Sequence, residues 1–302
     1  MSAEKGTKGM IRRVMVITGA TGGIGSAVSD RLADSETALF LHGFSRPEEL
    51  KAKGAALRKI SPFVETFQAD LSKEEDQNDF FNAFTHWVDA FPADSVRSIS
   101  WIHAAGKDLM TPEMRGLSFE ERLRRMITLD LTAPVRLSKL FGEWLIDRIR
   151  KGRGFQGTIK GTGEGEGKGN GKDFSEFVKG SDENHSVIFF GWDGVSRGME
   201  GETAQLYAIC KGGIGAFAKS FAQEVAPFLR VLTVSPGWIA TRWGTKASEK
   251  MNRRVRFESL SDRWGRPEEV ADLVAFLVSD KATYLNGVNL EINGGFDFRH
   301  SE

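Results

Sequence analysis

Two residues one helical turn apart carry the clearest chemistry in the sequence. Tyr207 and Lys211 are separated by three residues in the segment YAICK, within a stretch whose apolar pattern predicts a helix. Residues at this spacing share one face of a helix. A lysine ammonium beside a phenol favours the phenolate and lowers its pKa, which allows a tyrosine to exchange a proton with a carbonyl or an alcohol. The other tyrosine of the chain, Tyr284, has Val288 at the same offset.

A second candidate site follows the first predicted strand. The glycine-rich turn GATGGIG occupies residues 19–25 and leads into a predicted helix. Such a turn lets backbone N–H groups and the helix N-terminus approach a pyrophosphate. A simple chain reversal is the alternative, but the strand and helix on either side favour a dinucleotide. The candidate cofactor contacts in this turn are Gly19, Thr21, Gly23, Ile24 and Gly25.

The end of the second predicted strand indicates which dinucleotide binds. An acidic residue normally holds the ribose 2′-hydroxyl of NAD at this position, but residues 42–46 read HGFSR and contain no acid. A basic Arg46 suits a 2′-phosphate, which favours NADP. The alternatives are NAD as the cofactor and an ordinary solvated role for Arg46.

These residues must be positioned by alternating strands and helices. Short apolar runs alternate with amphipathic stretches, which indicates repeated βα units. We predict an α/β fold, a Rossmann-type doubly wound parallel sheet of about seven strands, in a single domain over residues 11–297 after an N-terminal tail, 1–10. The predicted strands are 14–18, 38–42, 63–69, 99–103, 187–190, 231–234 and 288–292. Predicted helices include 119–150, 203–226 and 267–279.

One segment interrupts this alternation. Nine of the twenty residues from 152 to 171 are glycine, with charged and polar residues between them. This composition predicts a flexible insertion at about 152–184. It precedes the strand that begins at Val187, so it joins the sheet at the amino ends of its strands, whereas ligands bind at the carboxyl ends. We expect a surface loop, with a partner-binding segment as the alternative.

The composition excludes several classes of function. Basic and acidic residues number 41 each, so the net charge gives no general attraction to nucleic acid or to an anionic membrane. One cysteine and five scattered histidines predict no internal disulfide and no metal site. No apolar run is long enough for a signal peptide or a membrane span. We therefore expect a cytoplasmic protein.

Further motifs complete a resemblance to a known family. Taken with the glycine turn and the Tyr-x-x-x-Lys pair, the chain resembles the short-chain dehydrogenase/reductase family, in particular enzymes similar to 3-oxoacyl-acyl-carrier-protein reductase, over nearly its whole length. The added motifs are Asp70-Leu71, HAAG at 103–106, PGWIAT at 236–241, RWGRPEEVA at 263–271 and the segment 287–295.

The resemblance implies roles for these residues. Tyr207 would donate a proton to a carbonyl while the nicotinamide delivers hydride, and Lys211 would bond the ribose and hold down the tyrosine pKa. It also implies a homo-oligomer, a dimer or tetramer, formed through helices 119–150 and 203–226. The implied cofactor contacts are Asp70, Leu71, Ala104, Ala105, Gly106, Pro236, Gly237, Ile239 and Thr241, together with Tyr207 and Lys211.

Two positions depart from the family pattern. The family has a serine some 13 residues before the tyrosine, and that position falls on Trp192 or Asp193. We favour Asp193, although an ionised carboxylate would repel a developing alkoxide unless burial kept it protonated. Trp192 offers a neutral indole N–H, and Ser196 is a third candidate. A structural role for all three is the remaining alternative.

The second departure replaces the asparagine of the family with Asp130. Pro134 has no N–H, so the carbonyl of residue 130 loses its helical partner and the helix kinks. In the family such a carbonyl holds a water of a proton relay to the lysine. The carboxylate of Asp130 would also stabilise the charged form of Lys211 and retune that relay. The alternative is a kinked helix with a solvated Asp130.

The substrate is indicated only by class. Residues 242–266, the mobile substrate lid of the family, contain eight basic and three acidic residues. This suggests an anionic substrate, such as an acyl thioester of CoA or acyl carrier protein. The alternative is that the segment is an ordinary solvated amphipathic helix. The leading hypothesis is an NADP-preferring reductase acting on a small-molecule carbonyl. A catalytically altered dinucleotide-binding sensor or scaffold is the second, and dehydration or epimerisation on the same fold is the third.

Overall fold

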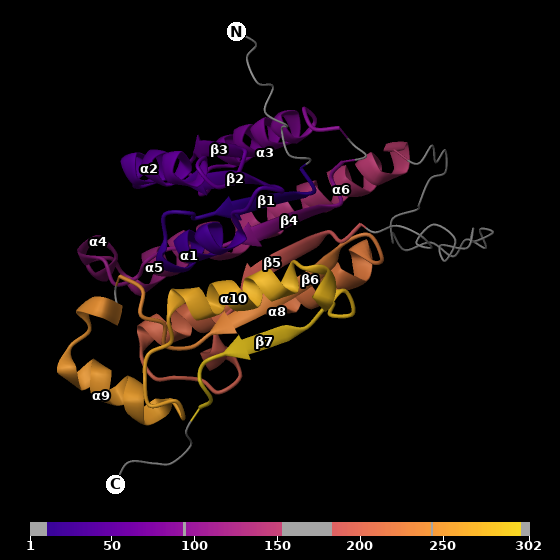
Figure 1. Ribbon diagram of the computed structural model, residues 1–302. Coiled ribbons are helices and arrows are strands. Elements are labelled where there is room, and N and C mark those ends of the chain that lie inside the picture. Colours follow the sequence, from indigo (N-terminus) through magenta and orange to yellow (C-terminus); the bar gives the residue numbers. More distant parts are fainter. Residues whose placement is uncertain (1–10, 93–94, 153–182, 243, 297–302) are drawn as a thin grey trace.

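The computed structural model describes residues 11–92, 95–152, 183–242 and 244–296. The predicted tail, 1–10, and residues 153–182 of the predicted insertion lie outside this range. Within it, seven parallel strands form one sheet in the order β3-β2-β1-β4-β5-β6-β7 (Figure 1). The strands are β1 Arg13–Thr18, β2 Thr37–Gly43, β3 Phe63–Gln68, β4 Ser98–His103, β5 Ser186–Phe190, β6 Arg230–Pro236 and β7 Asn289–Ile292.

The strand order reverses between β1 and β4. From β1 the chain adds β2 and β3 on one side, and from β4 it adds β5, β6 and β7 on the other. The carboxyl ends of β1 and β4 are in register, with Thr18 paired to His103. Ligands of open parallel sheets bind in the crevice at such a switch point. Figure 1 shows the strand arrowheads pointing toward the same end of the molecule.

Helices cover both faces of the sheet. One face packs against α1 (Gly23–Leu32), α2 (Pro47–Leu57) and α10 (Pro267–Leu277). The other packs against α3 (Glu74–Val88), α6 (Ala133–Gly152) and α8 (Glu202–Val225). The fold class and the strands predicted from the sequence are therefore confirmed. The shorter helices are α4 Pro112–Arg115, α5 Phe119–Met126 and α9 Glu249–Glu258, with 3₁₀ turns at Asp193–Val195, Gly244–Lys246 and Asp280–Ala282.

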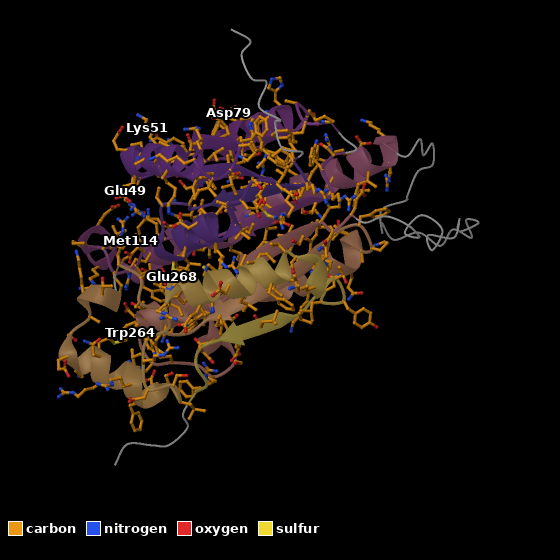
Figure 2. All side chains as sticks on the ribbon, viewed as in Figure 1. Glu49, Lys51, Asp79, Met114, Trp264 and Glu268 are labelled. Carbon is orange, nitrogen blue, oxygen red and sulfur yellow. The ribbon has the colours of Figure 1, made fainter. Side chains whose placement is uncertain are left out.

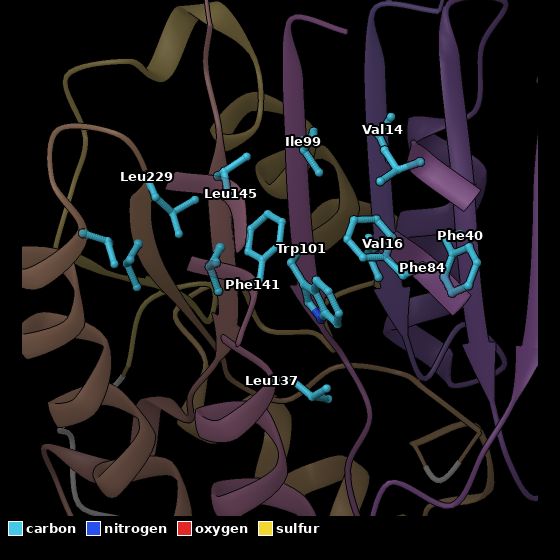
Figure 3. Packing of buried hydrophobic residues seen from close by; sticks show 14 of the residues in the cluster. Val14, Val16, Phe40, Phe84, Ile99, Trp101, Leu137, Phe141, Leu145 and Leu229 are labelled. Carbon is cyan, nitrogen blue, oxygen red and sulfur yellow. The ribbon is translucent and has the colours of Figure 1, made fainter. Parts of the chain in front are cut away.

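Alternation along the strands builds two apolar cores. In β1, Val14 and Val16 pack toward α3, α6 and α8, whereas Met15 and Ile17 pack toward α1 and α10. Successive side chains of a strand point to opposite faces, and a sheet covered on both faces favours nearly continuous apolar runs in its strands. Figure 3 shows the fully buried indole of Trp101 between Phe141 and Phe84 in the first of these cores.

The predicted helix 119–150 is divided into three parts. Helix α5 ends at Met126, a π-helical turn covers Ile127–Thr132, and α6 begins at Ala133. The turn closes with an Ala133 N–H that donates to the carbonyl of Thr128. A continuous helix was therefore the wrong prediction, although the break lies where Pro134 was expected to kink it. The physical consequence is that the π turn buries the side chain of Asp130.

Candidate active site

The glycine turn after β1 is built on close backbone contacts. Gly19 has a φ of +69°, and a Cβ at this residue would lie 2.6 Å from the carbonyl oxygen of Ala104. A Cβ on Gly25 would lie 2.3 Å from the carbonyl oxygen of Gly19. The Gly19 N–H donates to Nδ1 of His42 at 3.3 Å. Larger residues would therefore separate this turn from the ends of β2 and β4.

The N-terminus of α1 fits an anion. Its N-cap is Gly22, no side chain of the described residues caps it, and its first turn contains no acidic residue. The first N–H groups of a helix have no intrahelical acceptor and carry a partial positive charge. A Cβ on Gly23 would lie 2.7 Å from Cβ of Thr241, so the segment after β6 passes beside this helix start. The fold thus brings two predicted cofactor-binding segments together where a pyrophosphate fits.

Arg46 lies after β2 and shares a carboxylate with a second arginine. Its Nη1 donates to Glu49 at 3.0 Å, and Arg242, from the segment after β6, pairs with the same carboxylate. The guanidinium of Arg242, then that of Arg46, lowers the pKa of Glu49. Figure 2 shows Glu49 at the end of the molecule to which the strands point. Two cations on one anion leave a net positive charge beside the predicted site of the 2′-phosphate.

Asp70 and Leu71, the predicted cofactor contacts after β3, have different surroundings. Asp70 accepts hydrogen bonds from the N–H of Ser72 at 3.1 Å and from its hydroxyl at 2.7 Å, which fixes a local turn. Its own N–H donates to Asp76 at 2.7 Å. The side chain of Leu71 is buried in the core against α3. Leu71 therefore offers a ligand its main chain rather than its side chain.

The turn after β4 is supported by Asp130. The Ala105 N–H donates to the hydroxyl of Thr18 at 3.2 Å, and the Lys107 N–H donates to Asp130 at 2.8 Å. A Cβ on Gly106 would lie 2.9 Å from Oδ1 of Asp130. The carboxylate thus packs directly under the predicted cofactor-binding turn. The solvated reading of Asp130 is wrong, because its side chain is 2% exposed.

Asp130 also holds the lysine of the catalytic pair. Nζ of Lys211 lies 3.0 Å from Oδ1 of Asp130, and the lysine side chain is 13% exposed. The structure therefore joins Lys211, Asp130 and the turn after β4 in one charged and hydrogen-bonded group. A carboxylate so close neutralises much of the field that the ammonium would exert on Tyr207.

The pKa of Tyr207 moves in the direction opposite to the expected one. Burial is the main cause that raises this pKa above its usual value of 10, and the negative charges of Asp130 and Asp108 add to it. The predicted lowering by Lys211 is therefore wrong in this structure. Tyr207 is therefore protonated throughout the neutral range.

The residues at the family serine position point in different directions. The carboxylate of Asp193 pairs with Arg197 and accepts from Nδ2 of Asn293 at 3.2 Å, and burial raises its pKa. Ser196 donates to the carbonyl of Asp193 and to Glu291, each at 3.4 Å. The indole of Trp192, in contrast, lies with its ring centroid 6.1 Å from that of Tyr207. The structure brings Trp192 to the tyrosine, whereas the carboxylate of Asp193, the residue favoured from the sequence, is directed to Arg197 and Asn293.

The PGWIAT segment connects this site to the last strand. The Gly237 N–H donates to the carbonyl of Ile292 at 3.1 Å. A Cβ on Gly237 would lie 2.6 Å from Cβ of Asn293 and 3.1 Å from the carboxylate of Asp193. Ile239 is buried in the core beside α10, so its side chain serves packing. Pro236 ends β6, which places the segment at the carboxyl edge of the sheet.

Most of the basic side chains in the segment 242–266 form ion pairs, but some do not. Among the described residues, Lys246, Lys250 and Arg253 form no ion pair. The pairs that do form are Arg242–Glu49, Arg254–Glu258, Arg256–Asp262, Arg263–Glu269 and Arg266–Glu269. Three uncompensated cations therefore remain on and before α9.

Several site residues were missed from the sequence. Glu49 and Arg197 stand three and four residues from Arg46 and Asp193, and this ion-pair spacing was a usable signal. Arg242 meets Glu49 from 193 positions away, and no local pattern announces that contact. The described residues hold no group of three potential metal ligands, and none of their helices is long and apolar enough to cross a bilayer.

Fold and site together define a class of protein. A glycine turn at the switch point of a parallel sheet, together with a half-buried Tyr-x-x-x-Lys pair, is the arrangement of a dinucleotide-dependent oxidoreductase. The family profile described as short chain dehydrogenase matches residues 13–156, and the one described as enoyl-(acyl carrier protein) reductase matches residues 175–297. The chain belongs to the short-chain dehydrogenase/reductase family, whose members use NAD(P).

Individual relatives agree with this assignment. The chain is 26% identical over 290 residues to "Uncharacterized oxidoreductase YmfI" of Bacillus subtilis, covering 95% of this chain and 99% of the relative. It is 26% identical over 285 residues to the 3-oxoacyl-[acyl-carrier-protein] reductase FabG of Aquifex aeolicus, covering 94% and 96%. A short-chain dehydrogenase/reductase structure from Brucella melitensis superposes with a TM-score of 0.68 at 24% identity, covering 96% and 98%, which shows the shared fold.

Proposed function

We propose that this protein is an NADP-preferring reductase that transfers hydride between the nicotinamide and a carbonyl or alcohol substrate. The observation that carries the proposal is the group formed by Tyr207, Lys211 and Asp130. A half-buried phenol stands one helical turn from an ammonium, and the carboxylate that pairs with this ammonium also accepts from the turn after β4, at the carboxyl edge of the sheet. The glycine turn after β1 packs against Ala104 and Ala105, at the start of the same turn after β4.

The residues around the crevice suit NADP. When bound, the nicotinamide supplies or accepts the hydride. The N-terminus of α1 would hold the pyrophosphate. Arg46 would exchange its bond to Glu49 for one to the 2′-phosphate, and Arg242 would keep the carboxylate neutralised. This exchange favours NADP over NAD, because a 2′-hydroxyl gives Arg46 no comparable partner.

Tyr207 would act as the proton donor for carbonyl reduction. Its raised pKa keeps the hydroxyl protonated at neutral pH, so its proton is ready to move to the substrate oxygen as hydride reaches the carbonyl carbon. The ammonium of Lys211 would then stabilise the phenolate that remains. Asp130 holds that ammonium at a fixed distance and carries the turn after β4 on its other oxygen.

The substrate class we propose is a 3-oxoacyl thioester. The three unpaired cations near α9 suit the phosphates of a CoA or carrier-bound thioester. The Aquifex relative is named for reduction of a 3-oxoacyl carrier-protein substrate. A cytoplasmic homo-oligomer paired through α5, α6 and α8 remains a prediction, and light scattering tests its oligomeric part.

A cofactor and substrate panel tests the proposal. We would follow the reduced-nicotinamide absorbance with NADPH or NADH and with acetoacetyl-CoA, a neutral ketone of similar size, or no carbonyl. The proposal predicts turnover with NADPH that is faster on the thioester and that is lost in Tyr207→Phe. Tight NADPH binding without turnover on any carbonyl would overturn it in favour of the sensor or scaffold.

A further inference from the structure

A second hydrogen-bond donor is needed beside Tyr207. A carbonyl oxygen has two lone pairs, and the charge that develops on it in a water-poor site is stabilised by preorganised donors. The family supplies a serine hydroxyl at this point, and the present chain has none there. The question is which group of the segment 192–196 faces the tyrosine.

Two of the three candidates are engaged elsewhere. Asp193 directs its carboxylate to Arg197 and Asn293, and the guanidinium of Arg197 also lies 4.3 Å above the ring of Phe296. Ser196 is directed to Glu291 and to a backbone carbonyl. Both side chains therefore connect the loop after β5 to the end of β7. Neither faces the phenol.

The third candidate, Trp192, is held against the phenol. Its indole is tilted by 50° to the ring of Tyr207. On another side it lies over Gly194, where a Cβ would come within 2.3 Å of Cζ2 and 2.5 Å of Cε2. These atoms belong to the six-membered ring of the indole, and Cε2 is bonded to Nε1, so the glycine gives room to the edge of the indole next to the N–H. Gly194 therefore permits this position of the indole.

The N–H of Trp192 is not used within the protein. Two other indole N–H groups are bonded, because Trp238 donates to Glu258 at 2.8 Å and Trp264 to Asn252 at 3.0 Å, whereas that of the enclosed Trp101 has no partner among the described residues. Nε1 of Trp192 donates to no group in the part of the chain that the structure describes. Trp192 is half-buried, unlike the enclosed Trp101, so a bound molecule can reach it.

We propose that Nε1 of Trp192 donates a hydrogen bond to the substrate carbonyl oxygen beside the hydroxyl of Tyr207, in place of the serine of the family. The role rests on the proposed function. In the reduction, hydride from the nicotinamide forms the new C–H bond, the C=O π pair moves to oxygen, and the proton of Tyr207 forms the O–H bond. The N–H of Trp192 stays intact and stabilises charge on the oxygen. A neutral donor does this without the repulsion that an ionised Asp193 would add.

Substitutions at residue 192 test the proposal. Trp192→Phe keeps an aromatic ring beside Tyr207 and removes the N–H, so kcat should fall about 100-fold, the scale of losing one oxyanion donor. Trp192→His, assayed above its pKa, restores a neutral ring N–H and should recover at least half of that loss on a logarithmic scale. The Kd for NADPH, followed by nicotinamide fluorescence, and the Tm should stay near wild type in both.

A second variant acts on the position of the indole. Gly194→Ala should lower kcat to a similar extent, and combining it with Trp192→Phe should add little, because both remove one interaction. Gly116→Ala is the matched control, since a Cβ there meets only carbonyl oxygens at the ordinary contact distance of 3.6 Å, and it should leave kcat unchanged.

Failure of this role can be told apart from failure of the proposed function. Wild-type turnover with an unaltered kcat in Trp192→Phe would overturn the Trp192 role alone. Equal losses in the Phe and His variants would show a packing role and overturn it as well. A wild-type protein that binds NADPH and reduces no carbonyl would overturn the proposed function and this role together.

Discussion

The ion pair between Asp130 and Lys211 gives the sharpest quantitative prediction. Nζ and Oδ1 are 3.0 Å apart and nearly enclosed, so at an effective dielectric constant of about 20 the attraction is about 5.5 kcal/mol before desolvation. Removing one partner of a buried pair leaves an uncompensated charge and costs about 3 kcal/mol at the lower end of the usual range. Asp130→Asn and Lys211→Met should each lower the free energy of unfolding by about that amount. The double variant should cost little more than either single one, giving a coupling energy of about 2–3 kcal/mol.

The assay is urea unfolding of the four proteins at one protein concentration. The pair of Lys139 and Glu224 is the matched control, because it also spans 3.0 Å between two helices, α6 and α8, but its side chains are 45% and 48% exposed. Its coupling energy should stay below about 1 kcal/mol, as for other exposed pairs. The reasoning is refuted if the two cycles return the same coupling energy.

Three further predictions concern proton transfer, cofactor choice and stability. Alcohol oxidation needs the phenolate of Tyr207, whose pKa is raised, so the kcat for oxidation should still be rising with pH beyond about 10. Asp130→Asn removes a negative charge near the phenol and should move this pH profile to lower pH. Identical pH profiles for wild type and Asp130→Asn would contradict this. Arg46→Ala should raise the KM for NADPH about 10-fold and leave the KM for NADH unchanged. Equal effects on the two KM values would argue against binding of the 2′-phosphate by Arg46. Arg230 donates five hydrogen bonds from its guanidinium. Arg230→Met should therefore lower the free energy of unfolding by about 3 kcal/mol and the Tm by about 6–12 °C in a thermal scan. A Tm shift under about 2 °C would refute this stabilising role of Arg230.

Much of the fold follows from local sequence because its five central strands, β2, β1, β4, β5 and β6, are buried on both faces. Runs such as Val14 to Ile17 and Val187 to Phe190 are apolar throughout, and turns bound the strands, so each predicted strand is found to within two residues. The π turn at Ile127–Thr132 is different. Its pattern of apolar residues continues that of the flanking helices. Pro134 indicates a break in the helix, but it does not indicate that the turn at the break contains one more residue than an α-helical turn.

The candidate site also has a part that local sequence predicts and a part that it does not. Motifs read in one stretch, such as the glycine turn and the pair at 207 and 211, could be predicted because their chemistry depends on near neighbours. The partner of Lys211 was also anticipated, from the family position of Asp130. The direction of Asp193 was not, since it depends on Asn293, 100 positions away, and on a loop geometry that turns Trp192 toward the tyrosine instead. Contacts between distant segments set the pKa of Tyr207, which is why its sign was predicted wrongly.

The central claim is that this chain moves hydride between a nicotinamide and a carbonyl with Tyr207 as the proton donor. The most direct test is isotopic. NADPH carrying deuterium on the transferred position of the nicotinamide would be incubated with acetoacetyl-CoA, and the alcohol product analysed by mass spectrometry for wild type and Tyr207→Phe at equal cofactor occupancy. The account predicts one deuterium on the former carbonyl carbon with wild type and none above background with the variant. Bound cofactor that keeps its label in the wild-type protein, or equal transfer by Tyr207→Phe, would contradict it.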